Sequence, residues 1–406
     1  MKAGTALRES IAPTQRKRME MAADLAVNGA PPLFPEALHV GRPNIGPRAQ
    51  FDALMDEMFD RRWLSNDGPL LKRFEAAICQ RLGVKHCVAM CNGTIALEIA
   101  TRALGFSGEV IVPSYTFVAT AHALQWQEIT PVFADIDPET QVLDPVAVRK
   151  MLTPRTTGIL GVHLWGRAAP VEALRQIASE HGLKVMYDAS HGFGCTHGGV
   201  PLGNFGECEV FSFHATKFFN TFEGGAVVTN DDALADKMRL MRNFGFAGYD
   251  NVIYPGTNGK MTEVCAAMGL TNLDSLSQFV SGNLANYRAY RAAVEGIEGI
   301  RMLDFDAAET NNYQYIVLDV GSDFGVSRDR LIEILHAENI LARRYFWPGC
   351  HRMEPYRSHY PNAELMLPNT VRVANSVVVL PTGSAITPDD VAAIASVVRC
   401  AGTIGK

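Results

Sequence analysis

One stretch of this sequence reads Phe211-Ser212-Phe213-His214-Ala215-Thr216-Lys217, and Phe222-Glu223-Gly224-Gly225-Ala226 follows it closely. The lysine lies between an apolar run, typical of a strand, and a glycine pair. If it is buried there, desolvation lowers its pKa and leaves a neutral amine that can form a Schiff base. A single lysine after a strand more often extends its charged end to the surface. The residues around it must therefore decide between the two interpretations.

The sequence from Cys87 to Asn230 alternates short β-branched runs with amphipathic stretches. This alternation predicts parallel strands joined by helices, an α/β fold. The expected strands are Cys87–Met90, Val110–Val112, Pro131–Asp135, Gly158–His163, Lys184–Asp188, Glu209–Phe213 and Gly225–Thr229. The expected helices between them are Thr94–Leu104, Val118–Gln127 and Val171–His181.

Ligands of such sheets bind beyond the carboxyl ends of the strands. Asn92-Gly93-Thr94 follows one predicted strand and opens a helix whose free amides suit a phosphate, although a capped helix without a ligand has the same pattern. Asp188 ends another strand, where its carboxylate could hold a pyridine nitrogen in the protonated form. Taken alone, an Asp that caps the next turn is the more common case.

Pyridoxal phosphate requires a lysine imine, a protonated ring nitrogen, a stacked ring and an anchored phosphate. The order of Gly93, Asp188 and Lys217 along one predicted sheet edge supplies three of these. Phe117, after another strand, is the candidate for stacking, with core packing as its alternative. Ser212 could bond the phosphate, and His191 could reach the ring hydroxyl or cover the ring.

The composition is that of a globular protein of 406 residues, 47% hydrophobic, with a formal net charge of -6. The acidic balance argues against a broad nucleic-acid-binding surface. No apolar run is long enough for a membrane span, and the basic segment Arg8–Arg18 lacks the apolar core of a secretory signal, so we expect a cytoplasmic location.

The eight cysteines are scattered and expected to be reduced. A metal site at His191, Cys195 and His197 is disfavoured by its spacing, and none is predicted.

Three parts are predicted along the chain: an N-terminal arm at 1–46, a large domain at 47–275 and a smaller α+β domain at 276–406. The arm is expected because Pro31–Gly46 is rich in proline and glycine. The last part is expected to contain the helices Leu284–Val294 and Arg328–Glu338, the strand Tyr313–Asp319 and a closing helix from Asp389.

Several motifs together resemble the DegT/DnrJ/EryC1/StrS sugar aminotransferases over about Val40 to Val398. They are Trp63-Leu64-Ser65-Asn66-Asp67-Gly68-Pro69, Pro113-Ser114-Tyr115-Thr116-Phe117, Phe133-Ala134-Asp135-Ile136-Asp137, Val162-His163-Leu164-Trp165-Gly166, Asp188-Ala189-Ser190-His191 and Ser212-Phe213-His214-Ala215-Thr216-Lys217. The resemblance implies the aspartate aminotransferase-like fold, fold type I, with a mixed, mostly parallel large sheet. Ser190 departs from the more usual alanine.

The resemblance also implies roles for single residues. Lys217 is implied as the Schiff-base lysine, Asp188 as the pyridinium partner, and Phe117 or its neighbour as the ring stacker. The remaining cofactor contacts implied are Gly93, Thr94, Ile95, His191, Ser212 and His214. Asn258 is implied to reach the phosphate in a neighbouring subunit of a homodimer, although a turn residue between glycines would look the same.

The later run Tyr345–Tyr356 is similar to family members that aminate C4 of dTDP-4-keto-6-deoxy-D-glucose. The resemblance therefore implies L-glutamate as donor and this nucleotide sugar as acceptor, giving the 4-amino sugar and 2-oxoglutarate. Substrate contacts are expected from Trp63, Gly68, Pro69, His163, Tyr345, His351 and Arg352.

Other readings stay open at this point. A 3-keto sugar nucleotide or a keto-inositol could be the acceptor, and the chain could be a non-catalytic sugar-nucleotide binder, which the retained Lys217 disfavours. Family members with histidine at the lysine position are dehydratases, so Lys217 argues against that chemistry as well. A Rossmann dehydrogenase is disfavoured because Gly192-Phe193-Gly194 does not follow the required glycine spacing.

Overall fold

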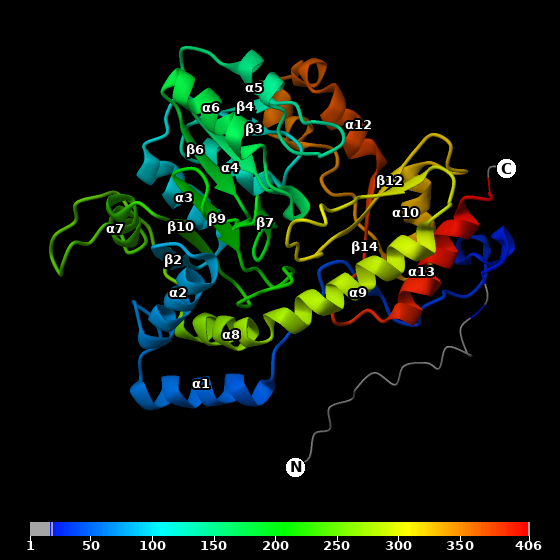
Figure 1. Ribbon diagram of the computed structural model, residues 1–406, viewed down its shortest axis with the longest axis horizontal. Coiled ribbons are helices and arrows are strands. Elements are labelled where there is room, and N and C mark those ends of the chain that lie inside the picture. Colours follow the sequence, from blue (N-terminus) through cyan, green and yellow to red (C-terminus); the bar gives the residue numbers. More distant parts are fainter. Residues whose placement is uncertain (1–16, 18, 405–406) are drawn as a thin grey trace.

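A computed structural model describes residues 17 and 19–404 and contains a seven-stranded sheet with helices on both faces (Figure 1). Its strands are β2 (His86–Met90), β3 (Glu109–Pro113), β4 (Thr130–Ala134), β5 (Thr156–Val162), β6 (Lys184–Asp188), β9 (Cys208–Ser212) and β10 (Gly225–Thr229). The strand order is β2-β10-β9-β6-β5-β3-β4. Only β10 runs antiparallel to its neighbours. The predicted α/β fold with a mixed, mostly parallel sheet is confirmed.

All seven strands predicted from the sequence are present, with ends that differ by at most two residues. They are found easily because both faces of the sheet are covered, so each strand is a nearly continuous apolar run. In β2, Val88 and Met90 enter one buried cluster, and Cys87 and Ala89 enter the cluster on the opposite face. The sheet is thus the core of the larger part of the molecule.

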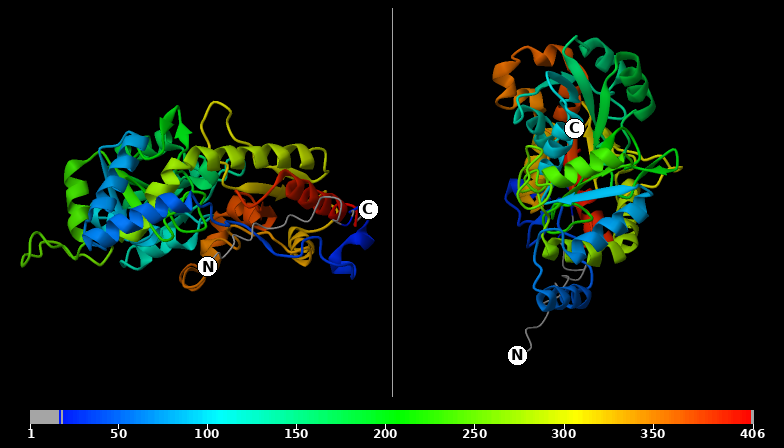
Figure 2. Two further views of the ribbon diagram at one scale, coloured as in Figure 1. Left: turned by 90° about the horizontal axis from the view of Figure 1, so that it is seen from below. Right: turned by 90° about the vertical axis from the view of Figure 1, so that its left-hand side faces the viewer.

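The helices around this sheet are α1 (Arg48–Arg61), α2 (Pro69–Leu82), α3 (Gly93–Leu104), α4 (Val118–Gln125), α5 (Pro145–Met151), α6 (Val171–His181), α7 (Asp232–Met241) and α8 (Glu263–Asp274). The three predicted helices correspond to α3, α4 and α6. The segment between α7 and α8 projects from the body of the molecule (Figures 1 and 2). Among the described residues, no helix combines the length and apolar content needed to cross a bilayer.

The C-terminal part has a three-stranded antiparallel sheet, in the order β11-β12-β14, packed against long helices. Its elements are α9 (Leu276–Val294), β11 (Ile300–Met302), β12 (Ile316–Val320), α10 (Arg328–Ala337), β13 (Ile340–Leu341), α11 (Tyr356–His359), α12 (Pro368–Ser376), β14 (Val377–Leu380) and α13 (Pro388–Ala401). Helix α9 begins earlier than predicted because Leu276 and Phe279 are buried and extend its apolar face. Strand β12 begins later than the predicted Tyr313, which has a positive φ of 50°.

The N-terminal segment lies beside α10 and α13 (Figure 1). The buried carboxylate of Glu338 accepts hydrogen bonds from the amides of Ala26 and Leu33, at 2.6 and 2.7 Å, and pairs with Lys17 at 3.0 Å. Strand β1 (Leu38–His39) then pairs with β13. Residues 1–16 and 18, which include most of the basic segment, and 405–406 lie outside the described residues.

The predicted division into an arm and two domains stays a prediction. Helices α8 and α9 meet at Ser275, next to the predicted boundary between the two domains. A small antiparallel pair, β7 (Thr196–His197) with β8 (Val200–Pro201), lies between β6 and β9 in the sequence.

Candidate active site

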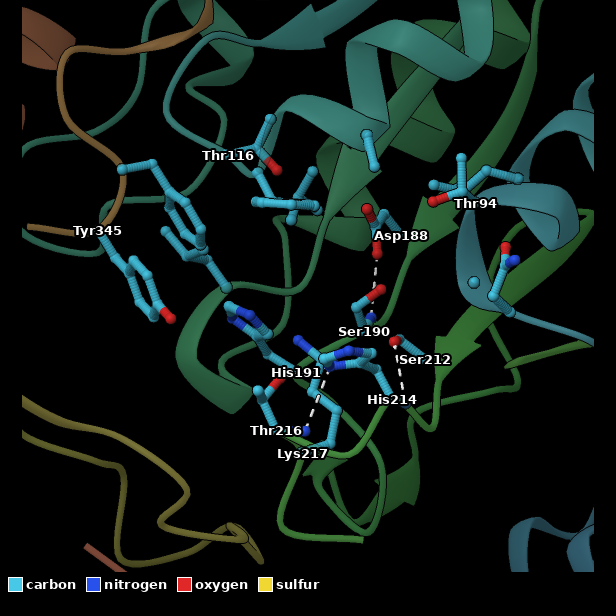
Figure 3. Close-up of a pocket in the computed structure, with 18 of the residues that line it drawn as sticks. Thr94, Thr116, Asp188, Ser190, His191, Ser212, His214, Thr216, Lys217 and Tyr345 are labelled. Carbon is cyan, nitrogen blue, oxygen red and sulfur yellow. Dashed lines mark hydrogen bonds between the residues drawn. The ribbon is translucent and has the colours of Figure 1, made fainter. Parts of the chain in front are cut away.

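A cavity of about 590 Å³ opens at the carboxyl ends of the strands (Figure 3). It brings together nine of the predicted site residues, which are Gly93, Thr94, Phe117, Asp188, His191, Ser212, His214, Lys217 and Tyr345. Strands β2, β6 and β9 place most of them, because each of these strands ends at the same sheet edge. This is the edge at which open α/β sheets bind ligands.

Lys217 lies in the connection between β9 and β10, and its amide donates to the carbonyl of His214 at 2.8 Å. Burial lowers the pKa of its ammonium group to about 8, and the nearby Asp188 carboxylate opposes that shift. A pKa of about 8 leaves roughly a tenth of the amine neutral at pH 7, against fewer than about one in a thousand for an ordinary lysine. The predicted tunable amine is therefore present.

Asp188 ends β6, is buried, and faces the cavity (Figure 3). One carboxylate oxygen accepts the Ser190 amide at 3.0 Å, and the other accepts the Thr120 hydroxyl at 2.8 Å. The Thr116 hydroxyl lies 2.9 Å from that of Thr120. These bonds fix the orientation of the carboxylate toward the cavity.

The turn at Asn92 and Gly93 begins α3, and the Asn92 side chain caps the helix by accepting the Ile95 amide at 2.8 Å. The amides of Gly93 and Thr94 are the first two of the helix, which have no acceptor within it. A Cβ on Gly93 would lie 3.1 Å from the Ser212 Cβ, so a side chain there would crowd Ser212 beside the cradle. The cradle thus fits a phosphate. Ile95 does not line the cavity, and its amide is already bonded.

His191 lines the cavity and is buried among aromatic rings. Its Nε2 lies 3.0 Å from the Tyr315 hydroxyl, and its ring stacks on Trp165 and Phe346 at centroid distances of 5.7 and 5.9 Å. Burial, assisted by the charge of Lys217, holds the pKa of His191 well below its usual value. The imidazole is therefore neutral at physiological pH.

Phe117 and His214 line the more open parts of the cavity. Phe117 precedes α4, its side chain is 59% exposed, and its ring is tilted against Phe346 at 6.4 Å. The exposure leaves this ring available to a ligand and argues against a role in core packing. His214 is half-buried, with Nδ1 2.8 Å from the Thr216 hydroxyl and Nε2 3.4 Å from the Glu223 carboxylate.

Several residues expected to contact the substrate lie outside this cavity. His163 is fully buried, stacks on Tyr187 at 4.7 Å and lies 3.0 Å from the Glu209 carboxylate. His351 is also buried, with Nδ1 2.7 Å from the Ser114 hydroxyl. Both rings have structural partners in the core instead of a free face toward the cavity.

The remaining predicted residues lie at the surface or at helix ends. The Arg352 side chain donates to Glu364 at 2.8 Å, and the Trp63 indole donates to the Asn66 carbonyl at 3.3 Å. Gly68 and Pro69 begin α2. Asn258 is exposed in the projecting segment between α7 and α8, outside the cavity of its own chain.

The structure adds residues that the sequence did not reveal, above all Thr120, Tyr315 and Arg343. Thr120 lies one helical turn after Thr116, a spacing that could have placed it beside Asp188. Tyr315 and Arg343 come from the C-terminal part, and no sequence signal placed them.

Among the described residues, no group of three or more His, Cys, Asp or Glu side chains is arranged to hold a metal ion.

Comparison with known proteins gives the family. The model of the DegT/DnrJ/EryC1/StrS aminotransferase family matches residues 47–399. The chain belongs to this family. The buried amine of Lys217, the oriented carboxylate of Asp188 and the phosphate cradle fit pyridoxal phosphate, so the chain is an aminotransferase that uses this cofactor.

Three relatives show how far the similarity extends. The dTDP-4-amino-4,6-dideoxy-D-glucose transaminase of Shigella dysenteriae is 37% identical over 362 residues, which cover 89% of this chain and 98% of the relative. The GDP-perosamine synthase of Caulobacter vibrioides is 35% identical, covering 82% and 91%. The crystal structure of DesI in the presence of its TDP-sugar product is 47% identical, with a TM-score of 0.89 and coverage of 94% and 97%.

The lowered pKa of Lys217 predicts a pH dependence for cofactor attachment. Only the neutral amine attacks a carbonyl, so the rate at which the apoprotein binds pyridoxal phosphate covalently should rise as pH increases toward 8 and then level off. Absorbance stopped-flow measures this rate, with a simple alkylamine as the reference. A rate that keeps rising toward pH 10, as the reference does, would contradict the assignment.

The hydroxyl of Thr120 predicts a second effect. Thr120→Val keeps the shape of the side chain but removes one donor to Asp188, so cofactor affinity should fall about tenfold. Titration of the apoprotein with pyridoxal phosphate measures it. The matched control is Thr271→Val, which loses a hydroxyl bond within α8 and lies outside the cavity. Equal affinities in the two variants would exclude Thr120 as a positioning residue.

Proposed function

We propose that this protein transfers an amino group from L-glutamate to C4 of dTDP-4-keto-6-deoxy-D-glucose, giving dTDP-4-amino-4,6-dideoxy-D-glucose and 2-oxoglutarate. The observation that carries the proposal is the buried Lys217 amine facing an oriented Asp188 carboxylate in one cavity. The similarity to a dTDP-4-amino-4,6-dideoxy-D-glucose transaminase and to DesI supports the choice of sugar.

The cofactor would be held by Lys217, Asp188, Ser212 and the amides of Gly93 and Thr94. When bound, pyridoxal phosphate supplies an electron sink that stabilises negative charge on the carbon bearing the amino group. Asp188 would hold the ring nitrogen in its protonated form, which such a sink requires. Because Ser190 and Thr120 fix both of its oxygens, the carboxylate does not have to reorient during the reaction.

Lys217 has a second task once it is released from the cofactor. Its Nζ takes a proton from the donor's carbon and, in the second half of the reaction, delivers a proton to the sugar's C4. A pKa of about 8 suits both directions, because the amine is readily protonated and deprotonated near neutral pH. Neutral His191 does not compete for this proton, since its pKa is held low, and its ring is fixed by Tyr315.

We propose that the active unit is a homodimer in which Asn258 of one chain completes the phosphate site of the other. The support is that Asn258 is exposed, belongs to the segment between α7 and α8, and lies outside the cavity of its own chain. This segment also exposes apolar side chains, including Val252 and Ile253, which a partner chain would cover. The cytoplasmic location expected from the sequence stays a prediction.

The reaction is tested directly with purified holoenzyme, L-glutamate and dTDP-4-keto-6-deoxy-D-glucose. NMR of the product should show an amine at C4 with 2-oxoglutarate formed in equal amount, and Lys217→Ala should form neither. A GDP-linked 4-keto sugar and a 3-keto sugar nucleotide serve as competing acceptors. An amine at another carbon, or a marked preference for another acceptor, would contradict the proposed substrate.

Composite sites predict complementation between two inactive variants. Lys217→Ala and Asn258→Ala should each lose most activity as homodimers. A mixed dimer of the two contains one site with both wild-type residues, so random mixing of equal amounts should restore about a quarter of wild-type activity. Turnover after refolding the mixture measures it. Absence of any recovery, with mixed dimers present by native mass spectrometry, would place Asn258 outside the partner's site.

A further inference from the structure

A second cavity of about 400 Å³ adjoins the first. The two share the lining residues Thr116, Phe117, Arg343, Tyr345 and Phe346. The rest of the second cavity is formed by α10 and by the residues that follow Phe346, including the partly exposed Trp347. Arg343 therefore lies where the cofactor cavity passes into a second compartment.

The main chain around Arg343 is firmly held. Its amide and carbonyl exchange hydrogen bonds with Val379 of β14 at 2.9 and 2.8 Å. Its guanidinium lies 5.3 Å from the centre of the Tyr345 ring, and the Tyr345 carbonyl accepts the Tyr115 hydroxyl at 2.5 Å. Among the described residues, no carboxylate forms an ion pair with Arg343. Arg343 is exposed, and a guanidinium without an ion-pair partner on a firmly held main chain at a cavity junction is suited to bind an anion.

This anion is not the phosphate of the cofactor. The phosphate cradle at Thr94 and the Tyr345 ring lie on opposite sides of Lys217 and Asp188 (Figure 3). Because Arg343 stacks on Tyr345, it belongs to the end of the cavity away from the cradle. Its anion must come from a substrate.

The shapes of the two substrates distinguish between them. In L-glutamate, the α-carboxylate is attached to the reacting carbon and stays beside Lys217. Its γ-carboxylate is joined to that carbon through only two methylene groups, so the donor brings no group that would fill a second compartment. In a hexose, C1 lies across the ring from C4, so a sugar with C4 at Lys217 directs its diphosphate away from the reacting end. The nucleoside then extends farther still and needs a second compartment, which the adjoining cavity provides.

The far wall of that cavity suits a nucleobase. Trp347 is 41% exposed, and the guanidinium of Arg344 lies 4.5 Å from the centre of its ring. Arg344 is itself held by Asp329 at 3.1 Å. An indole with accessible ring surface can stack on a base, and ligand sites commonly combine such apolar walls with a few polar groups.

We infer that the second cavity binds the nucleoside diphosphate portion of the acceptor, with Arg343 on the diphosphate and Trp347 against the base. This inference rests on the proposed function, since it assumes a nucleotide-linked acceptor. It assigns Arg343 to the acceptor and not to the amino donor. The two half-reactions can therefore be measured separately to test it.

The test uses holoenzyme and three readouts: calorimetric binding of dTDP, KM for the sugar nucleotide, and the absorbance change that glutamate alone produces in the bound cofactor. Arg343→Ala should weaken dTDP binding and raise the sugar-nucleotide KM about tenfold or more, because a charge-assisted bond to phosphate is lost. The glutamate half-reaction should stay within about twofold of wild type, since its carboxylates do not depend on Arg343. Trp347→Ala should act in the same direction, and Trp347→Phe should restore most of the affinity.

Arg330→Ala is the matched control, because Arg330 is a partly exposed arginine of α10 that pairs with Glu333 and lines neither cavity. Unchanged dTDP affinity in Arg343→Ala would overturn the inference, and so would an equal loss in the glutamate half-reaction. Measurements on the wild-type enzyme alone test the proposed function. A wild-type enzyme that reacts with glutamate but aminates no nucleotide sugar would exclude the function itself.

Discussion

The active site depends on the close approach of two backbone segments at the edge of the large sheet. A Cβ on Gly225 would lie 2.6 Å from the carbonyl carbon of Asn92 and 2.6 Å from the amide nitrogen of Gly93. Because Gly225 has no side chain, β10 can run antiparallel between β2 and β9. Gly225 is paired there with Met90 of β2 and with Ser212 of β9. The phosphate cradle, Ser212 and the lysine loop converge because this contact leaves no space for a side chain.

The electrostatics of the cavity follow from that packing. Burial disfavours the charged form of Lys217, while Asp188 limits how far its pKa falls. The same burial keeps His191 neutral. The cavity thus combines a lysine whose pKa is about 8 with the Asp188 carboxylate, which two hydrogen bonds hold in place. Arg343 adds a positive charge away from the phosphate cradle, where the acceptor of the proposed reaction would carry its diphosphate.

Much of this arrangement could be predicted from the sequence. A strand in a sheet with helices on both faces is a continuous apolar run, and the carboxyl ends of the parallel strands lie at one edge of the sheet. That reasoning placed Asp188 and Lys217 in the same cavity. It misplaced His163 because β5 ends at Val162, which lines the cavity, and the imidazole that follows packs against Tyr187 in the core. Thr120 and Arg343 were not predicted, since their relation to the site depends on how distant segments pack. The role of Asn258 in a neighbouring subunit stays a prediction.

The central claim is that Lys217 is the residue to which pyridoxal phosphate attaches. Borohydride reduction of the holoenzyme makes that attachment permanent, and peptide mass spectrometry then locates it. We expect one phosphopyridoxyl group per chain, on the peptide containing Lys217, and loss of that label when excess glutamate is added before reduction. A label on another lysine, or one that glutamate does not remove, would contradict it.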